Sequence, residues 1–259
     1  MNAPITSNNP LIKVDGLTLG WGDRVLLENA SFEVKRGDIF AILGGSGCGK
    51  STMLRHLIGL ESPLAGSIEI EGKPSTSLSV GRPEFGVMFQ SGALFGSMTV
   101  GENLALQLTQ WTELETDAIN AIVRAKLRLV GLNDAEDKFP SELSGGMKKR
   151  AAIARAMVLE PDLLFLDEPS AGLDPVSSFE LDALIKSLNE ALGLTVVFVS
   201  HELESIFSIA TGCVMLDRES KSIIARGDPR VLRDTSKDPR VSSFFNRRAA
   251  ADSTSERNA

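Results

Sequence analysis

The chain has 259 residues, of which 42% are hydrophobic and 24% are charged, a balance typical of globular proteins and not of disordered or collagen-like chains. Its 27 Lys and Arg residues and 34 Asp and Glu residues give a net charge of −7, so we expect no nucleic-acid partner, because a phosphate-backbone surface needs a basic stripe. The two cysteines, Cys48 and Cys213, cannot build a disulfide framework, and we expect neither a signal peptide nor a transmembrane helix, which needs about 20 consecutive apolar residues.

The first part of the chain predicts strands that lead into a glycine-rich loop. Residues 11–34 alternate apolar and polar side chains in two runs, with a turn at 21–23 between them. The apolar segment that starts at Asp38 is typical of a buried strand, and a helix with one apolar face follows the loop. Further short strands are predicted over 67–72 and at the end of 80–90.

The second part alternates helices with buried strands. Helical periodicity covers about 100–132 and 147–159, and no core strand is apparent anywhere in 91–160. Then come a strand, a helix, a strand, a short helix and a strand, at 162–169, 179–192, 195–202, 204–210 and from 213. Strands that alternate with helices predict a mostly parallel α/β sheet, with 91–160 as a helical insertion.

The two ends of the chain depart from this pattern. Residues 1–9 predict a loose polar lead-in, and the last 14 residues predict disorder. Between Asp228 and that end lie five apolar residues: Val231, Leu232, Val241, Phe244 and Phe245. The sequence leaves open whether this segment docks on a partner subunit or on its own domain.

Residues 44–51 match the pattern G-x-x-x-x-G-K-[ST] between a predicted strand and a predicted helix. The glycines let backbone N–H groups point at phosphate oxygens, and the helix N-terminus adds its positive dipole end. Lys50 is placed to reach the β- and γ-phosphates, Ser51 offers a hydroxyl to Mg²⁺, and Thr52 can bond a phosphate oxygen. The predicted nucleotide-binding residues here are Gly44, Gly45, Ser46, Gly47, Cys48, Gly49, Lys50, Ser51 and Thr52.

An apolar strand ends in two neighbouring carboxylates, Asp167 and Glu168. Asp167 is expected to hold the Mg²⁺ hydration shell, and Glu168 to polarise the attacking water. Acids often cap a strand end at a protein surface, so this pair alone carries little weight. Together with the phosphate loop, however, it predicts a hydrolytic site.

Further motifs bring out a family resemblance. The run from Leu143 to Met147, LSGGM, precedes a basic and then apolar helix, and it resembles the signature motif of ATP-binding cassette (ABC) ATPases. The other motifs follow in the family's order over residues 10–228. Trp21 matches the residue that stacks on adenine, Gln90 the Q-loop glutamine, Ser170–Asp174 the D-loop, and His201 the switch histidine.

The resemblance implies a fold, an activity and a set of cofactors. The fold is an α/β P-loop NTPase with a RecA-like core over 10–90 and 161–228, an N-terminal antiparallel β subdomain, a helical subdomain over 91–160 and a C-terminal tail over 229–259. The activity is ATP hydrolysis coupled to transport, with ATP and Mg²⁺ as cofactors. The implied catalytic residues are Glu168, His201 and Gln90, and the implied Mg²⁺ ligands are Ser51, Gln90 and Asp167.

A second anion-binding loop stands about 90 residues after the first. Ser144, Gly145 and Gly146 precede a predicted helix, so their N–H groups and one hydroxyl form a nest for an anion. The resemblance implies a head-to-tail homodimer in which ATP lies between the phosphate loop of one subunit and the signature of the other. Asp174 then lies at the subunit interface.

Two features resemble one branch of the family, the ATPases of MCE-linked (Mla-type) phospholipid transport systems. These are Met147 in place of the usual glutamine and the run FQSGALFGSMTVGENL from Phe89. The branch implies a multispanning permease, an MCE-domain lipid-binding protein and, in some systems, a small STAS-domain protein. The ATPase is then peripheral at the cytoplasmic face of the inner membrane. A different cargo and an ATP-gated scaffold with little turnover are the alternatives.

Simpler interpretations exist for several of these residues. Trp21 suits an exposed turn, Gln90 a strand end, His201 a protein core, and Asp174 a turn before proline. We expect Lys148, Lys149 and Arg150 to form a solvated helix face, and Cys48 to fill space in the loop. The apolar residues Leu94, Phe95 and Met98 are expected in part to fill the junction between subdomains and in part to receive a permease helix.

Overall fold

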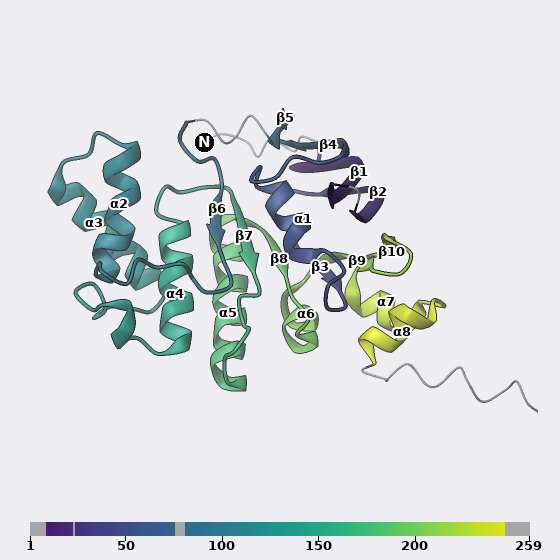
Figure 1. Ribbon diagram of the computed structural model, residues 1–259. Coiled ribbons are helices and arrows are strands. Elements are labelled where there is room, and N and C mark those ends of the chain that lie inside the picture. The colour runs from purple at the N-terminus through teal and green to yellow at the C-terminus, as the bar shows by residue number, and fades with distance from the viewer. Residues whose placement is uncertain (1–8, 23, 76–80, 247–259) are drawn as a thin grey trace, which may run out of the picture.

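The computed structural model describes residues 9–22, 24–75 and 81–246, and it contains two sheets with helices around the larger one (Figure 1). The expected polar lead-in over 1–9 lies almost wholly outside the described residues. So does the expected disorder of the last 14 residues. Among the described residues, none of the helices is both long and apolar enough to cross a lipid bilayer.

The larger sheet has six strands in the order β10-β9-β3-β8-β7-β6. Their bounds are Ser222–Gly227, Gly212–Asp217, Ile39–Gly44, Thr195–Val199, Leu163–Asp167 and Gly86–Met88. All neighbours are parallel except β9 and β10, which are antiparallel. This confirms the mostly parallel α/β sheet. Because parallel strands end at the same edge, the segments that follow β3, β7 and β8 meet there.

Side chains on these strands alternate between two hydrophobic layers, as the two-residue period of a strand requires. In β3, Ile39 and Leu43 face the layer that holds α4, α5 and α6, whereas Phe40 and Ile42 face the layer under the smaller sheet. The helices of the first layer are Gly145–Ala156 (α4), Pro175–Leu192 (α5) and Leu203–Ile209 (α6). Helix α1 (Lys50–Leu57) lies in the second layer.

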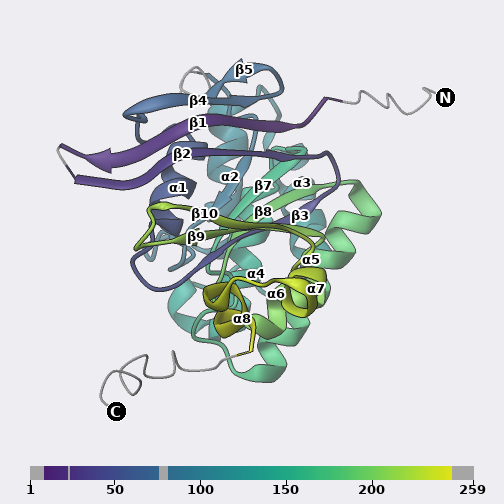
Figure 2. The same cartoon turned by 90° about the vertical axis from the view of Figure 1, so that its right-hand side faces the viewer.

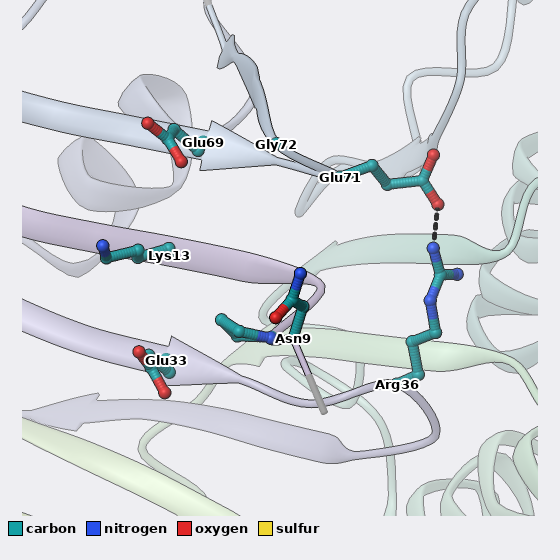
Figure 3. Close-up of a pocket in the computed structure, with 8 residues that line it drawn as sticks. Asn9, Lys13, Glu33, Arg36, Glu69, Glu71 and Gly72 are labelled. Carbon is teal, nitrogen blue, oxygen red and sulfur yellow. Dashed lines mark hydrogen bonds and ion pairs between the residues drawn. The ribbon is translucent and has the colours of Figure 1, made fainter. Parts of the chain in front are cut away.

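The smaller sheet is antiparallel, in the order β2-β1-β4-β5. Its strands are Ile12–Trp21 (β1), Arg24–Val34 (β2), Ala65–Ile70 (β4) and Lys73–Pro74 (β5), so the two predicted runs in 11–34 do pair around the turn. Its outer face is charged: Lys13 stands in register with Glu33 on one side and Glu69 on the other (Figure 3). At the end of this face Arg36 forms an ion pair with Glu71 at 2.6 Å.

Residues 91–160 were predicted to be a helical insertion, and their described regular structure is helical. It contains α2 (Val100–Trp111), α3 (Thr116–Leu129), the short 3-10 helix Pro140–Glu142 and α4. A capping box starts α2, because Thr99 accepts from the backbone N–H of Glu102 while Glu102 accepts from that of Thr99. Apolar side chains of the three α-helices pack into the layer shared with α5 and α6.

Some predicted boundaries were wrong. Helix α5 begins at Pro175, not 179, because Asp174 caps it and proline suits the first helical position. Strand β4 covers Ala65–Ile70 instead of 67–72, and the antiparallel β10 was not predicted. These errors leave unchanged the order of those strands and helices that were predicted.

The segment after Asp228 forms two short helices, α7 (Pro229–Thr235) and α8 (Pro239–Phe245), below β9 and β10 (Figure 2). Val241 and Phe245 are buried in the layer of α4–α6, and the ring of Phe245 lies 5.6 Å from that of Phe207 on α6. Val231, by contrast, is exposed. Of the two open possibilities for this segment, the structure therefore shows docking on its own domain.

Candidate functional site

A cavity of about 610 Å³ opens where the segments after β3, β7 and β8 meet. It combines backbone groups, charged side chains and aromatic rings, the mixture expected of a cofactor site. Its lining residues are Trp21, Arg24, Leu26, Gly44, Gly45, Ser46, Gly47, Gly49, Lys50, Ser51, Thr52, Gln90, Glu168, His201 and Phe244. Most of the predicted nucleotide-binding and catalytic residues therefore line one cavity.

The phosphate loop connects β3 to α1 and needs glycine for its shape. Gly44 has a φ of 144°, and a Cβ there would collide with the Leu216 carbonyl and the Cys48 sulfur. Gly49 has a φ of 101° and stands at the N-cap of α1. The loop therefore delivers the free N–H groups at the start of α1 to the cavity wall, where an anion is favoured.

Lys50 places its ammonium group in this loop. Nζ donates to the carbonyl oxygens of Gly44 and Gly45 at 3.0 and 3.1 Å. These bonds hold a positive charge at the cavity wall beside the N-terminus of α1, and two sources of positive potential there suit a polyphosphate.

Ser51 and Asp167 meet across the edge of the sheet. Oγ of Ser51 donates to Oδ1 of Asp167 at 3.2 Å, and burial raises the pKa of the Asp167 carboxyl, partly offset by that hydrogen bond. A half-buried carboxylate beside a hydroxyl offers the hard oxygen ligands that Mg²⁺ prefers. In the part of the chain that the structure describes, no cluster of three His, Cys, Asp or Glu side chains suits a metal. The residues thus fit an ion that takes its other ligands from phosphates and water.

Glu168 and His201 approach each other from the ends of β7 and β8. Nδ1 of His201 lies 2.9 Å from each carboxylate oxygen of Glu168, with the hydrogen bond directed to Oε1. Glu168 has a φ of 48°, an uncommon value for a residue with a side chain, and its N–H donates to the Val199 carbonyl at 3.0 Å. An outlier of this kind at a cavity wall is typical of a functional residue.

Gln90 lies just after β6 and lines the same cavity. The expectation of a solvated face for Lys148, Lys149 and Arg150 was wrong for Lys149, which is only 8% exposed. Its Nζ donates to the carbonyls of Gln90 and Glu168 at 2.6 and 3.2 Å. Arg150 is mostly buried as well and forms an ion pair with Glu180 at 2.8 Å. Sequence periodicity did not reveal this burial, because the partners of these two side chains lie in other segments: Gln90, Glu168 and Glu180.

Trp21 stands at the end of β1, where 49% of the residue is exposed, and it lines the cavity. Three other lining residues were not predicted: Arg24, Leu26 and Phe244. Arg24 could have been found, since a short turn after Trp21 must bring the start of the next strand beside it, and the two residues do pair in register. Phe244 comes from α8, and no local pattern signals its position.

Cys48 belongs to the phosphate loop but does not line the cavity. The residue is 2% exposed, and burial raises the pKa of its thiol despite the nearby charge of Lys50. This agrees with the expected space-filling role.

The signature residues lie away from the cavity wall. Oγ of Ser144 accepts from the N–H of Met147 and caps α4, and a Cβ on Gly145 would stand 3.3 Å from Leu173. Asp174 caps α5 by accepting from the N–H groups of Val176 and Ser177, and the hydroxyl and N–H of Ser177 lower the pKa of its carboxyl. The structure therefore joins the signature to the D-loop of the same chain but not to its own phosphate loop.

A parallel sheet with a glycine-rich phosphate loop, a Ser51–Asp167 pair and a Glu168–His201 pair at one edge defines a P-loop nucleotide-binding protein. The comparisons with known proteins narrow this class. The family model for the ABC transporter matches residues 27–171. The chain is 43% identical over 243 residues to the intermembrane phospholipid transport system ATP-binding protein MlaF of Haemophilus influenzae, covering 92% of this chain and 91% of that one.

Another relative and a solved structure resemble the chain over most of its length. The probable ribonucleotide transport ATP-binding protein mkl of Mycobacterium leprae is 41% identical over 92% of this chain and 69% of its own. The dimeric, post-hydrolysis structure of the ATP-binding cassette MJ0796, bound to ADP and Pi, has a TM-score of 0.74 and 27% identity, with 84% of this chain and 98% of that one covered. The chain therefore belongs to the ABC transporter family. It is an ATPase whose ATP hydrolysis is coupled to transport.

Proposed function

We propose that this chain is the motor subunit of an ABC transporter that moves phospholipids between the inner and outer membranes and so maintains envelope lipid asymmetry. The observation that carries the proposal is the full-length similarity to a relative named for intermembrane phospholipid transport. Met147 in the signature and the run from Phe89 support the same branch.

We further propose roles for the residues around the cavity. Trp21 stacks on adenine, the loop from Gly44 to Thr52 binds the phosphates, and Mg²⁺ is held by Ser51, Gln90 and Asp167. When bound, the ion would supply positive charge that offsets the negative charge of the phosphates. Glu168 is the general base for water, and His201 orients it and contacts the γ-phosphate. The carboxylate held 2.9 Å from His201 supports this assignment.

The division of the chain is part of the same proposal. The nucleotide-binding core comprises 10–90 and 161–228, the helical subdomain 91–160, and the tail 229–259. Supporting it, the described strands of the two sheets all lie in the first two ranges, whereas 91–160 contains only helices and loops.

We propose that two copies assemble head to tail around two ATP molecules. The signature, with its helix N-terminus at Ser144, lies outside the chain's own cavity, so its anion nest requires a nucleotide held by another subunit. The D-loop residue Asp174 caps α5 beside this nest and completes the interface. The dimeric description of the similar cassette is consistent with this arrangement.

The proposed partners are a multispanning permease, an MCE-domain lipid-binding protein and, as in some systems of this branch, a small STAS-domain protein. The permease docks on the helical subdomain beside the Q-loop, where Phe95 is 52% exposed while Leu94 packs against the core. This docking holds the ATPase peripherally at the cytoplasmic face of the inner membrane.

The test is a detergent-solubilised pull-down of the full chain from its own membranes, with mass spectrometry of bound proteins and lipids. A permease, an MCE-domain protein and phospholipid support the proposal. A permease with a different substrate-binding protein overturns the lipid cargo and favours another substrate, as the name of the mycobacterial relative suggests. Recovery of no membrane protein favours an ATP-gated scaffold.

A further inference from the structure

Helix α4 carries a buried lysine that touches two parts of the nucleotide site without lining the cavity. Nζ of Lys149 donates to the carbonyl of Gln90 at 2.6 Å and to that of Glu168 at 3.2 Å. The two acceptors stand far apart in the chain, after β6 and β7 respectively, and α4 begins at the signature motif. One ammonium group thus connects the signature helix to both segments.

Burying this charge is costly, so the contacts must compensate for it. Lys149 is 8% exposed, and burial lowers the pKa of its ammonium, while the carboxylates of Asp167 and Glu168 oppose that shift. Hydrogen bonds from a charged donor are about twice as strong as neutral ones, which suits a bond that has to fix a backbone carbonyl. A neutral side chain of the same length would fill the space but not hold the carbonyls.

The backbone at Glu168 is held by several partners. Glu168 has a φ of 48°, and its carbonyl accepts from Ala171 N–H as well as from Lys149. Its N–H is bonded to Val199 at the end of β8, which leads to His201. The peptide that aims the Glu168 carboxylate is therefore held on one side by the sheet and on the other by α4.

A second buried cation on α4, Arg155, contacts the segment after Gln90 but not the Glu168 peptide. Arg155 donates to the carbonyls of Gly92 and Ala93 at 3.1 and 2.6 Å, and so it fixes the Q-loop alone. Among the described residues, Lys149 is the side chain of α4 that also reaches the Glu168 peptide. The neighbouring Lys148 makes no side-chain hydrogen bond or ion pair within the described part of the chain and serves as its matched control.

We propose that Lys149 is a positioning residue that ties the signature helix to Gln90 and Glu168, so that a shift of α4 changes the aim of the hydrolytic glutamate. The inference rests on the role proposed above for Glu168. It gives the helical subdomain a direct mechanical connection to the site of hydrolysis in its own subunit.

The first measurement is amide hydrogen exchange of the full-length Lys149→Met and Lys148→Met variants. Loss of a charge-assisted bond is expected to speed exchange at Gly92 and Ala171 about tenfold in Lys149→Met. Their N–H groups bond within the two held segments, to Phe89 and Glu168. Lys148→Met should match the wild type. Unchanged exchange at both amides in Lys149→Met would overturn the proposal. Should that variant fail to fold, Lys149→Gln, which keeps a neutral amide donor group, is measured instead, with a smaller increase expected.

The second measurement is ATP turnover in a double-mutant cycle with Glu168→Gln. A misdirected base is expected to lower kcat of Lys149→Met about 10- to 100-fold while KM changes less than about threefold. In the Glu168→Gln background the same change should cost less than about twofold. If Lys149→Met speeds amide exchange but leaves kcat normal, the lysine has only a structural role. The same conclusion follows if Lys149→Met lowers kcat equally in the wild-type and Glu168→Gln backgrounds. If Glu168→Gln itself turns over like the wild type, the proposed base is wrong, while faster exchange still demonstrates the connection.

Discussion

Nδ1 of His201 lies 2.9 Å from both carboxylate oxygens of Glu168, although the residues are 33 positions apart. They follow the neighbouring parallel strands β7 and β8, whose C-terminal ends share one edge of the sheet. The contact requires a proton on Nδ1 when Glu168 is ionised, because a carboxylate only accepts. The histidine thus restricts the rotation of the carboxylate and leaves Nε2 directed away from it.

This pairing leads to the first prediction, for Glu168→Gln. The amide keeps the size of the side chain but cannot accept a proton from water, so ATP turnover should fall about 10²- to 10⁴-fold while ATP affinity changes little. Light scattering should then show a stable dimer in the presence of ATP and Mg²⁺. Turnover is measured by phosphate release at saturating ATP.

The neighbouring acid supplies the control for this prediction. Glu202 also approaches His201, with Oε1 3.5 Å from Nε2, yet it does not line the cavity. Glu202→Gln should therefore keep wild-type turnover within about twofold. Equal loss in both variants would show that the negative charge near His201 matters, and not a base at Glu168.

The second prediction concerns Trp21, which lines the cavity, and Trp111, which lies at the end of α2. Stacking of adenine on an aromatic ring contributes about 1–3 kcal/mol, so Trp21→Ala should weaken ATP binding roughly 5- to 150-fold and Trp21→Phe much less. The chain has two Trp residues, so fluorescence separates them. ATP should change the emission of Trp111→Phe but not that of Trp21→Phe, and the reverse pattern would exclude stacking on Trp21.

The sequence alone predicted most of the strands and helices in their order, because the two periodicities differ clearly and helices usually join parallel strands. It could not place Val241 and Phe245 in the core, since that depends on the distant α6. Strand β10 was missed because its residues are mostly half-buried and lack a two-residue alternation.

The candidate site residues were predicted from local sequence motifs. The loop from Gly44 to Ser51 and the acids at 167 and 168 depend on neighbours in sequence. Most of the loop and Glu168 line one cavity, and Asp167 is hydrogen-bonded to Ser51 of that cavity. Lys149 and Phe244 were misjudged because their partners come from other elements. A run of basic residues does not reveal which of them turns inward.

The third prediction is that the thiols are unreactive in the folded chain. Cys48 and Cys213 are buried, and burial raises the pKa of both, that of Cys213 to about 12. Because the thiolate is the reactive form, labelling by a disulfide reagent at pH 8 should be slow in buffer and reach two groups per chain in denaturant. The opposite outcome is rapid labelling of one thiol in the wild type that is lost in Cys48→Ser. It would show that the loop thiol is exposed and that ATP binding is sensitive to oxidants.

The fourth prediction concerns Asp182, a buried acid on α5. Burial raises its pKa to about 6, partly offset by a hydrogen bond from Ser205, and its Oδ1 has no hydrogen-bond partner among the described residues. Ser205 in turn lies 3.2 Å from Ser170 of the D-loop, between the hydroxyl oxygens. The folded state therefore holds a proton that the unfolded chain, with a pKa near 3.9, releases earlier.

The sign of the pH dependence follows from this difference. Between pH about 4 and 6 the folded state binds more protons than the unfolded one, so its stability falls as the pH rises, by at most about 3 kcal/mol, and then levels off. Asp182→Asn removes this titration, so its stability relative to the wild type should increase across that window. Urea unfolding midpoints at pH 4.5, 6 and 8 measure the difference. Glu219→Gln, which changes an exposed acid between β9 and β10, is measured beside it as the control for removal of an acid. Parallel profiles for the wild type and Asp182→Asn would mean that Asp182 is ionised in the folded protein throughout, with a partner for its second oxygen.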